Sequence, residues 1–152
     1  MKHIFILDEN VLLFAITGKN CHDEDDTSAC NLILQMARNC HRVAWNHELK
    51  IRYSRKIDAL LKGRTKPFAN AQKVLFGLMT KQEKNLENES CLDLDLDLDD
   101  DKHVINLAIS TSGILVTEDY RLKKKLERKK LVVKYGLKIV TPEEALAFAD
   151  DR

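Results

Sequence analysis

The sequence predicts an α/β fold in which helices cover a mostly parallel β-sheet. Short apolar runs alternate with longer segments whose apolar residues recur at helical spacing, and this pattern favours a helix-covered sheet over an all-α or all-β domain. The first run, IFIL at 4–7, is continuously apolar, as in a parallel strand that is buried on both faces. Because the 152 residues contain no repeat or linker, we expect one domain, 1–152.

Local patterns place the individual elements. Strands are expected at 4–7, 42–45, 114–117, 132–134 and 138–140. Helices are expected at 11–17, 27–39, 46–61, 67 to about 86 and 102–111, with one more just past Asp119 and a last one opened by Thr141. Asn46 and Thr141 are natural N-caps, and Thr141 is followed by a first-turn proline and a capping-box glutamate.

The composition is that of an ordinary soluble protein and identifies no partner. Charged residues make up 32% of the chain, yet the formal net charge is only +1. The four cysteines form no C-x-x-C pair, so a zinc or redox site is not expected, and reduced thiols are the default. The apolar run after Met1 is too short for a signal peptide or a membrane span. We therefore expect a cytoplasmic protein without a membrane partner.

Aspartates stand at three element ends that a parallel sheet would bring together. Asp8 follows the first strand and Asp119 follows the strand at 114–117, so both belong to carboxyl ends of strands, where open α/β sheets form their sites. Asp101 begins the helix at 102–111, where free N–H groups favour a carboxylate. Crowded carboxylates are stabilised by a divalent cation, and Mg²⁺ and Mn²⁺ prefer such oxygen ligands.

The acidic run LDLDLDLDDDKH at 92–103 has two interpretations. It is either a solvated loop, or a segment whose last acids bind a cation where the next helix begins. We assign the second role to Asp100 and Asp101, and expect the preceding aspartates to be solvated. His103 could donate a proton, but metal-dependent hydrolysis does not need one, so we expect it to cap or pack.

Three stretches together resemble the PIN-domain ribonucleases, a family that includes the VapC-type toxins. They are FILDENVLL at 5–13, DDKHVINLAISTSGILVTED at 100–119 and LKIVTPEEAL at 137–146. The resemblance implies a three-layer α/β/α fold with a central, mostly parallel sheet of about four or five strands. It also implies a Mg²⁺- or Mn²⁺-dependent endoribonuclease, a homodimer, and an antitoxin or another protein partner besides RNA.

The resemblance assigns roles to individual residues. The catalytic and metal-binding residues would be Asp8, Asp101 and Asp119, with Asp100 as a further metal ligand. Asn10 and Thr117 would orient these acids by hydrogen bonds, as groups around metal ligands do.

One position departs from the family pattern. The family carries a glutamate near the second turn of the helix after its second strand, and this chain has Arg52 there. Glu48, one turn earlier, either takes the acidic role and helps to bind the metal ion, or is a first-turn glutamate favoured by the helix dipole. Because Glu48 and Arg52 share one face of the helix, we expect them to interact.

Two groups of basic residues are expected to contact RNA phosphates, in contacts that weaken as the salt concentration rises. The first group, on and after the helix at 46–61, is Arg52, Arg55, Lys56, Lys62, Arg64 and Lys66. The second, past Asp119, is Arg121, Lys123, Lys124, Lys125, Arg128, Lys129 and Lys130. We assign RNA binding to Arg52, Arg55, Lys123 and Lys124; the alternative is that these faces only keep the protein soluble.

Three functions remain open on these residues. The first is a metal-dependent endoribonuclease, either toxin-like or RNA-processing. The second is a PIN-like scaffold that has lost turnover and binds RNA or a protein, which Arg52 favours. A third, a phosphoryl-transfer enzyme with an aspartate nucleophile, is disfavoured because DEN at 8–10 lacks the second aspartate of a D-x-D motif.

Overall fold

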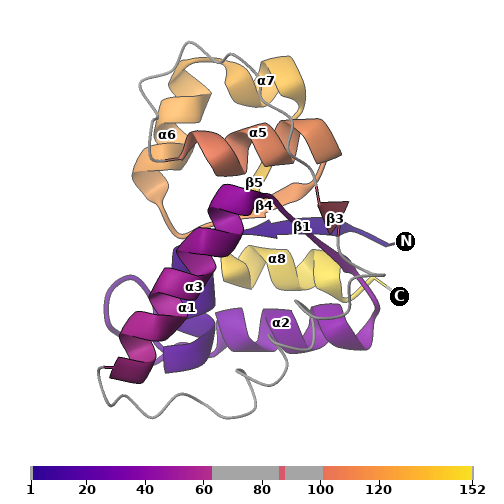
Figure 1. Cartoon of the computed structure of the whole chain (residues 1–152). Coiled ribbons are helices and arrows are strands. Elements are labelled where there is room, and N and C mark those ends of the chain that lie inside the picture. Colours follow the sequence, from indigo (N-terminus) through magenta and orange to yellow (C-terminus); the bar gives the residue numbers. More distant parts are fainter. Residues whose placement is uncertain (1, 63–85, 88–100, 152) are drawn as a thin grey trace.

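The protein has three layers, with a parallel sheet between two sets of helices (Figure 1). The structure is a computed structural model that describes residues 2–62, 86–87 and 101–151. The strands are β1 (Ile4–Leu7), β2 (Arg42–Trp45), β3 (Leu86–Glu87), β4 (Ile114–Val116) and β5 (Lys138–Val140). The helices are α1 (Glu9–Thr17), α2 (Ser28–Arg38), α3 (His47–Lys62), α5 (Lys102–Thr111), α6 (Tyr120–Arg128), α7 (Leu131–Tyr135) and α8 (Pro142–Ala149). The expected α/β class is confirmed.

The sheet has the strand order β3-β2-β1-β4-β5, and every neighbouring pair is parallel. β1 lies at its centre, where Phe5, Ile6 and Leu7 are all buried. Helices α5, α6 and α7 lie on one side of the sheet, and α1, α2 and α8 on the other (Figure 1). This double cover explains why the β1 sequence is continuously apolar rather than alternating.

Both predicted N-caps are confirmed. Asn46 Oδ1 accepts the backbone N–H of Leu49 at 2.9 Å, at the start of α3. Thr141 Oγ1 accepts the backbone N–H of Glu144 at 3.2 Å, with a proline in the first turn of α8. Each cap satisfies a backbone donor that the first helical turn leaves unpaired.

One predicted strand is wrong, and one predicted helix boundary, at Leu86, is corrected. The run at 132–134 is not a strand but part of α7, between Lys130 and Gly136, whose backbones are both left-handed (φ 57° and 62°). Val133 is 85% exposed, so this apolar run does not enter the sheet, and β5 takes the position beside β4. Leu86, expected at the end of a helix, begins β3 beside β2.

Several predicted features lie outside the described residues. These are most of the helix expected from 67 to about 86, Asp100 with the aspartates before it, Arg64, Lys66 and the side chain of Lys62. No helix in the described part of the chain is long and apolar enough to cross a membrane.

Candidate active site

The parallel pairing of β1 with β4 brings two of the predicted acids to one edge of the sheet. Asp8 directly follows β1, and its backbone N–H donates to the carbonyl oxygen of Val116 at 3.1 Å. Thr117 and Asp119 follow β4, the strand beside β1. Asp8 and Asp119 therefore lie at the carboxyl ends of adjacent strands.

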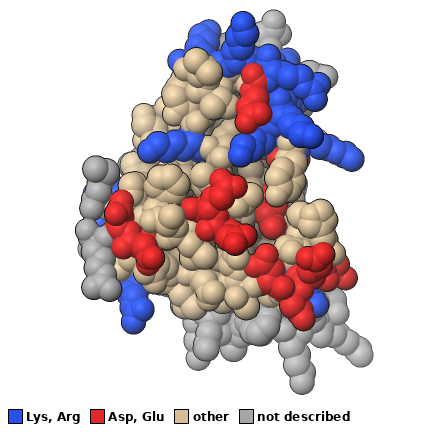
Figure 2. Space-filling model, turned by 180° about the vertical axis from the view of Figure 1, so that it is seen from behind, with Lys and Arg blue, Asp and Glu red and all other residues tan. Residues whose placement is uncertain are grey.

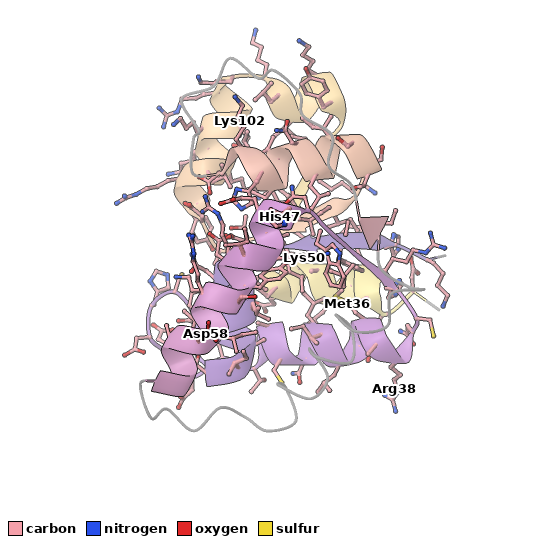
Figure 3. The ribbon with its side chains drawn as sticks, in the orientation of Figure 1. Met36, Arg38, His47, Lys50, Asp58 and Lys102 are labelled. Carbon is pink, nitrogen blue, oxygen red and sulfur yellow. The ribbon has the colours of Figure 1, made fainter. Side chains whose placement is uncertain are left out.

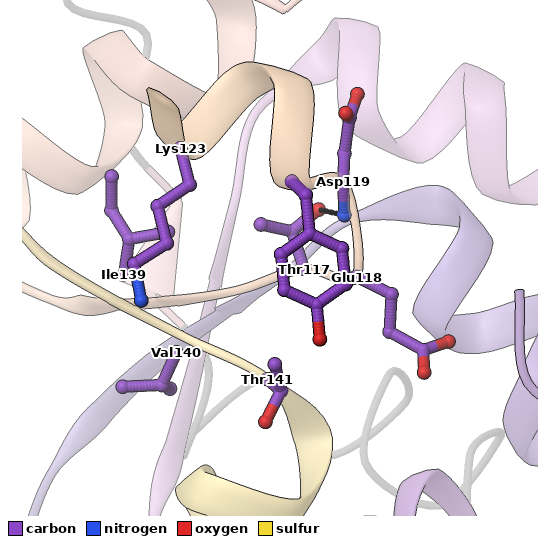
Figure 4. A pocket seen from close by; sticks show the side chains of 8 residues that line it. Thr117, Glu118, Asp119, Lys123, Ile139, Val140 and Thr141 are labelled. Atoms are coloured by element: carbon purple, nitrogen blue, oxygen red, sulfur yellow. Dashed lines mark hydrogen bonds between the residues drawn. The ribbon is translucent and has the colours of Figure 1, made fainter. Parts of the chain in front are cut away.

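Thr117 connects these two acids. Its buried hydroxyl donates to Asp8 Oδ2 at 2.9 Å. The same hydroxyl accepts the backbone N–H of Asp119 at 3.1 Å (Figure 4). Asp119 Oδ1 accepts the backbone N–H groups of Arg121 and Leu122 at 3.0 and 3.1 Å, and so caps α6. Thr117 thus orients one carboxyl group directly and the other through its backbone.

Asp8 is the most perturbed acid of this group. The side chain is buried with its residue only 5% exposed, and burial, followed by the hydrogen bond and the charge of Glu9, raises the pKa of Asp8 to about 8. The Thr117 hydroxyl lowers this pKa, and the charge of Asp101, which precedes α5, raises it. Asp101 therefore lies close enough to Asp8 for its charge to disfavour ionisation of the Asp8 carboxyl.

The sequence interpretation missed Glu9, which turns inward beside Asp8. Glu9 Oε1 lies 3.3 Å from an Arg52 guanidinium nitrogen, and Oε2 lies 3.7 Å from His103 Nε2. Burial opposes ionisation of Glu9, but its pairing with His103 and with Asp8 prevails and lowers its pKa. The pKa values of these two adjacent carboxyl groups are thus shifted in opposite directions, that of Glu9 downward and that of Asp8 upward. The Asp-Glu pair in the sequence was the only local sign of this arrangement.

Arg52 stands between the two glutamates. Its Nε donates to Glu48 Oε1 at 2.9 Å while its other contact is Glu9, so the predicted Glu48–Arg52 pair is present. The Glu48 side chain is 48% exposed, whereas that of Glu9 is 13% exposed. The structure therefore brings Arg52 and Glu9 to the buried side of α3, and leaves Glu48 on the outer side of the guanidinium group.

A cleft of about 510 Å³ opens beside the acids. Asp8, Asn10, Asp119, Tyr120 and Arg121 are among the residues that line it. Its volume falls within the range of about 300–1,000 Å³ that is usual for small-molecule sites. Asn10 is exposed at this cleft, and the Tyr120 ring is 57% exposed. The cleft is large enough for part of a nucleotide chain.

The predicted RNA-binding cations occupy different surroundings. Lys124, like Arg121, is exposed on α6, and Lys123 lines a small recess with Asp119 and Thr141 (Figure 4). Lys and Arg side chains gather at the end of the molecule formed by α6 and α7 (Figure 2). Arg55 is exposed on α3, the helix that carries His47 and Asp58 (Figure 3). The partly buried Arg52 is already bonded to two glutamates.

The donor chemistry of the acids fits the implied Mg²⁺ or Mn²⁺, because carboxylate oxygens are the ligands these ions prefer. Burial, and after it the neighbouring acids Glu9 and Asp101, raise the pKa of Asp8, and a bound cation would favour its ionised form. Within residues 2–59 and 101–151, whose side chains are described, no group of three His, Cys, Asp or Glu residues is arranged to hold a metal ion. No protein-family model matches this sequence, and no curated protein matches it.

Proposed function

We propose that the protein is a metal-dependent endoribonuclease that hydrolyses RNA phosphodiester bonds in the cleft beside Asp8 and Asp119. The observation that carries the proposal is the Thr117 bridge, which joins Asp8 and Asp119 at adjacent strand ends on the rim of the cleft. The resemblance of three sequence stretches to PIN-domain ribonucleases supports it.

Asp8, Asp101 and Asp119 would hold the divalent ion, with Asp100 as a further ligand from outside the described residues. When bound, such an ion supplies an activated water and neutralises charge on the departing oxygen. Thr117 orients Asp8 and fixes the backbone of Asp119. Arg121, Lys123 and Lys124 would hold phosphates of the RNA chain next to the cleft, through contacts that weaken with salt.

The test is cleavage of single-stranded RNA by the purified protein with Mn²⁺, with Mg²⁺ and with EDTA. Asp8→Asn should abolish cleavage, because the amide cannot supply the anionic ligand. Asp58→Asn, the same change at an exposed position on α3, is the matched control and should cleave as the unmodified protein does. Cleavage that persists in EDTA, or in Asp8→Asn, would contradict the proposal.

A second function is a scaffold that binds RNA or a protein without turnover. Arg52 favours it, because a fixed cation already lies between Glu9 and Glu48, where the family pattern has an acid. In that case RNA binding would depend on salt, and no RNA product would accumulate with any divalent ion. A homodimer and an antitoxin partner stay predictions.

A further inference from the structure

We propose that Glu9 is a positioning residue that acts through Asp8, and that Arg52 and His103 hold Glu9 in the orientation this requires. The inference rests on the proposed function, because the role of Asp8 is to hold a metal ion. Asp8 and Asn10 line the cleft, whereas Glu9, between them, contacts Arg52 and His103.

Three helices supply this group. Glu9 begins α1, Arg52 belongs to α3 and His103 to α5, and their side chains are 13%, 24% and 7% exposed. Removing one partner of the partly buried Glu9–Arg52 pair leaves the charge of the other without its partner, which is costly. Arg52 therefore fixes Glu9 by a hydrogen bond at Oε1, and the His103 ring lies against Oε2.

The inner atoms of this group are incompletely paired. Among the described residues, Glu9 Oε2 and His103 Nε2 are both buried without a hydrogen-bond partner, and at 3.7 Å they are too far apart to bond to each other. Asn46 Nδ2 donates to the His103 carbonyl oxygen at 3.1 Å, so the backbone of His103 is anchored independently of its ring. Buried polar atoms without partners are rare in folded proteins, and each has a cause such as a bound water, an ion or a catalytic role.

Asp8 is held by Thr117 on one side and is followed directly by the anchored Glu9. The Thr117 hydroxyl donates to Asp8 Oδ2 at 2.9 Å. Glu9, the next residue, is bonded to Arg52 at 3.3 Å, and the Asp8 carbonyl oxygen accepts the backbone N–H groups of Val11 and Leu12 at the start of α1, so the anchoring of Glu9 fixes the start of the helix that directly follows Asp8. Groups that orient a metal ligand in this way typically change metal affinity or activity by about 10–100-fold when they are mutated. Glu9 would thus hold Asp8 in place while remaining outside the cleft.

The test measures Mn²⁺ affinity by calorimetry, without RNA, for the unmodified protein and for Glu9→Gln. We expect Glu9→Gln to bind Mn²⁺ about tenfold more weakly than the unmodified protein. Its RNA affinity in EDTA should be unchanged, and its kcat should fall while its KM stays the same. Glu127→Gln, an exposed glutamate on α6, is the matched control and should bind Mn²⁺ normally. If Glu9→Gln does not fold, His103→Gln replaces it, because it leaves the Glu9–Arg52 pair in place and changes only the side chain beside Glu9 Oε2; it should also weaken Mn²⁺ binding.

The outcomes separate this inference from the proposed function. An unmodified protein that binds no Mn²⁺ would overturn both. If the unmodified protein binds Mn²⁺ and Glu9→Gln binds it equally well, the positioning role of Glu9 is overturned and the proposed function is not. Weakened binding in Glu48→Gln with normal binding in Glu9→Gln would assign the role to Glu48 instead.

Discussion

Replacing Thr117 with valine tests the bridge on which the site depends. Valine keeps the shape of the side chain but removes the hydroxyl that bonds to Asp8 and to the backbone of Asp119. Each hydrogen bond contributes about 1 kcal/mol net, so two bonds give a loss of about 2 kcal/mol. For a chain of 152 residues, this loss lowers Tm by about 4–8 °C.

The loss should also depend on pH. The pKa of Asp8 is raised to about 8, and the Thr117 hydroxyl lowers it, so the variant should have a still higher Asp8 pKa. A raised carboxyl pKa means that the native state loses stability as pH rises from the unfolded pKa to the native one. In Thr117→Val this decline continues to higher pH, so the stability difference between variant and unmodified protein should grow above about pH 8.

Urea unfolding at about pH 6 and about pH 9 measures both effects. Thr111→Val is the matched control, because within the described residues its hydroxyl bonds to the Leu107 carbonyl oxygen of α5, at 2.7 Å, and to no group of the site. The control should lose less than about 1 kcal/mol, equally at both pH values. Equal losses in the two variants, or a Thr117→Val loss that is independent of pH, would refute the reasoning.

Three further changes test the fold. Burial lowers the pKa of His41, so the unfolded chain binds a proton at this residue more readily than the native protein does. The native state is therefore most favoured by this residue above about pH 6.5, and it loses stability as pH falls toward the native pKa. In His41→Gln, urea midpoints should drop less between about pH 7.5 and about pH 5. Gly113→Ala places a Cβ 3.1 Å from the Ile4 carbonyl oxygen and should cost about 1–3 kcal/mol. Tyr53→Phe removes the bond to the Leu7 carbonyl oxygen, and calorimetry should register about 1 kcal/mol.

Local sequence patterns were sufficient to predict the strands and helix caps that position the site. A continuously apolar strand followed by an aspartate occurs twice, and parallel pairing of these strands brings Asp8 and Asp119 together. The caps Asn46 and Thr141 were also readable, because a cap depends on a few consecutive residues. The run at 132–134 was wrongly predicted to be a strand because its β-branched residues suit a strand. In the structure, β5 occupies the position beside β4, so this run is not part of the sheet.

The surroundings of Asp8 depend on contacts between helices and were not readable. Glu9 could equally face solvent, and its inward direction is set by Arg52 of α3 and His103 of α5. His103 packs, as expected, but against a carboxylate rather than an apolar surface. Such contacts join residues that are 43 and more positions apart in the chain, and no local pattern encodes them.

The most direct test of the central claim is a crystal structure of the protein soaked in Mn²⁺, with the ion located by its anomalous scattering. The account predicts a Mn²⁺ ion in the cleft, bound by the carboxylates of Asp8 and Asp119, with Asp101 turned toward it. A crystal in which Mn²⁺ avoids these carboxylates, or in which Asp8 keeps only its Thr117 and Glu9 contacts at saturating Mn²⁺, would contradict it.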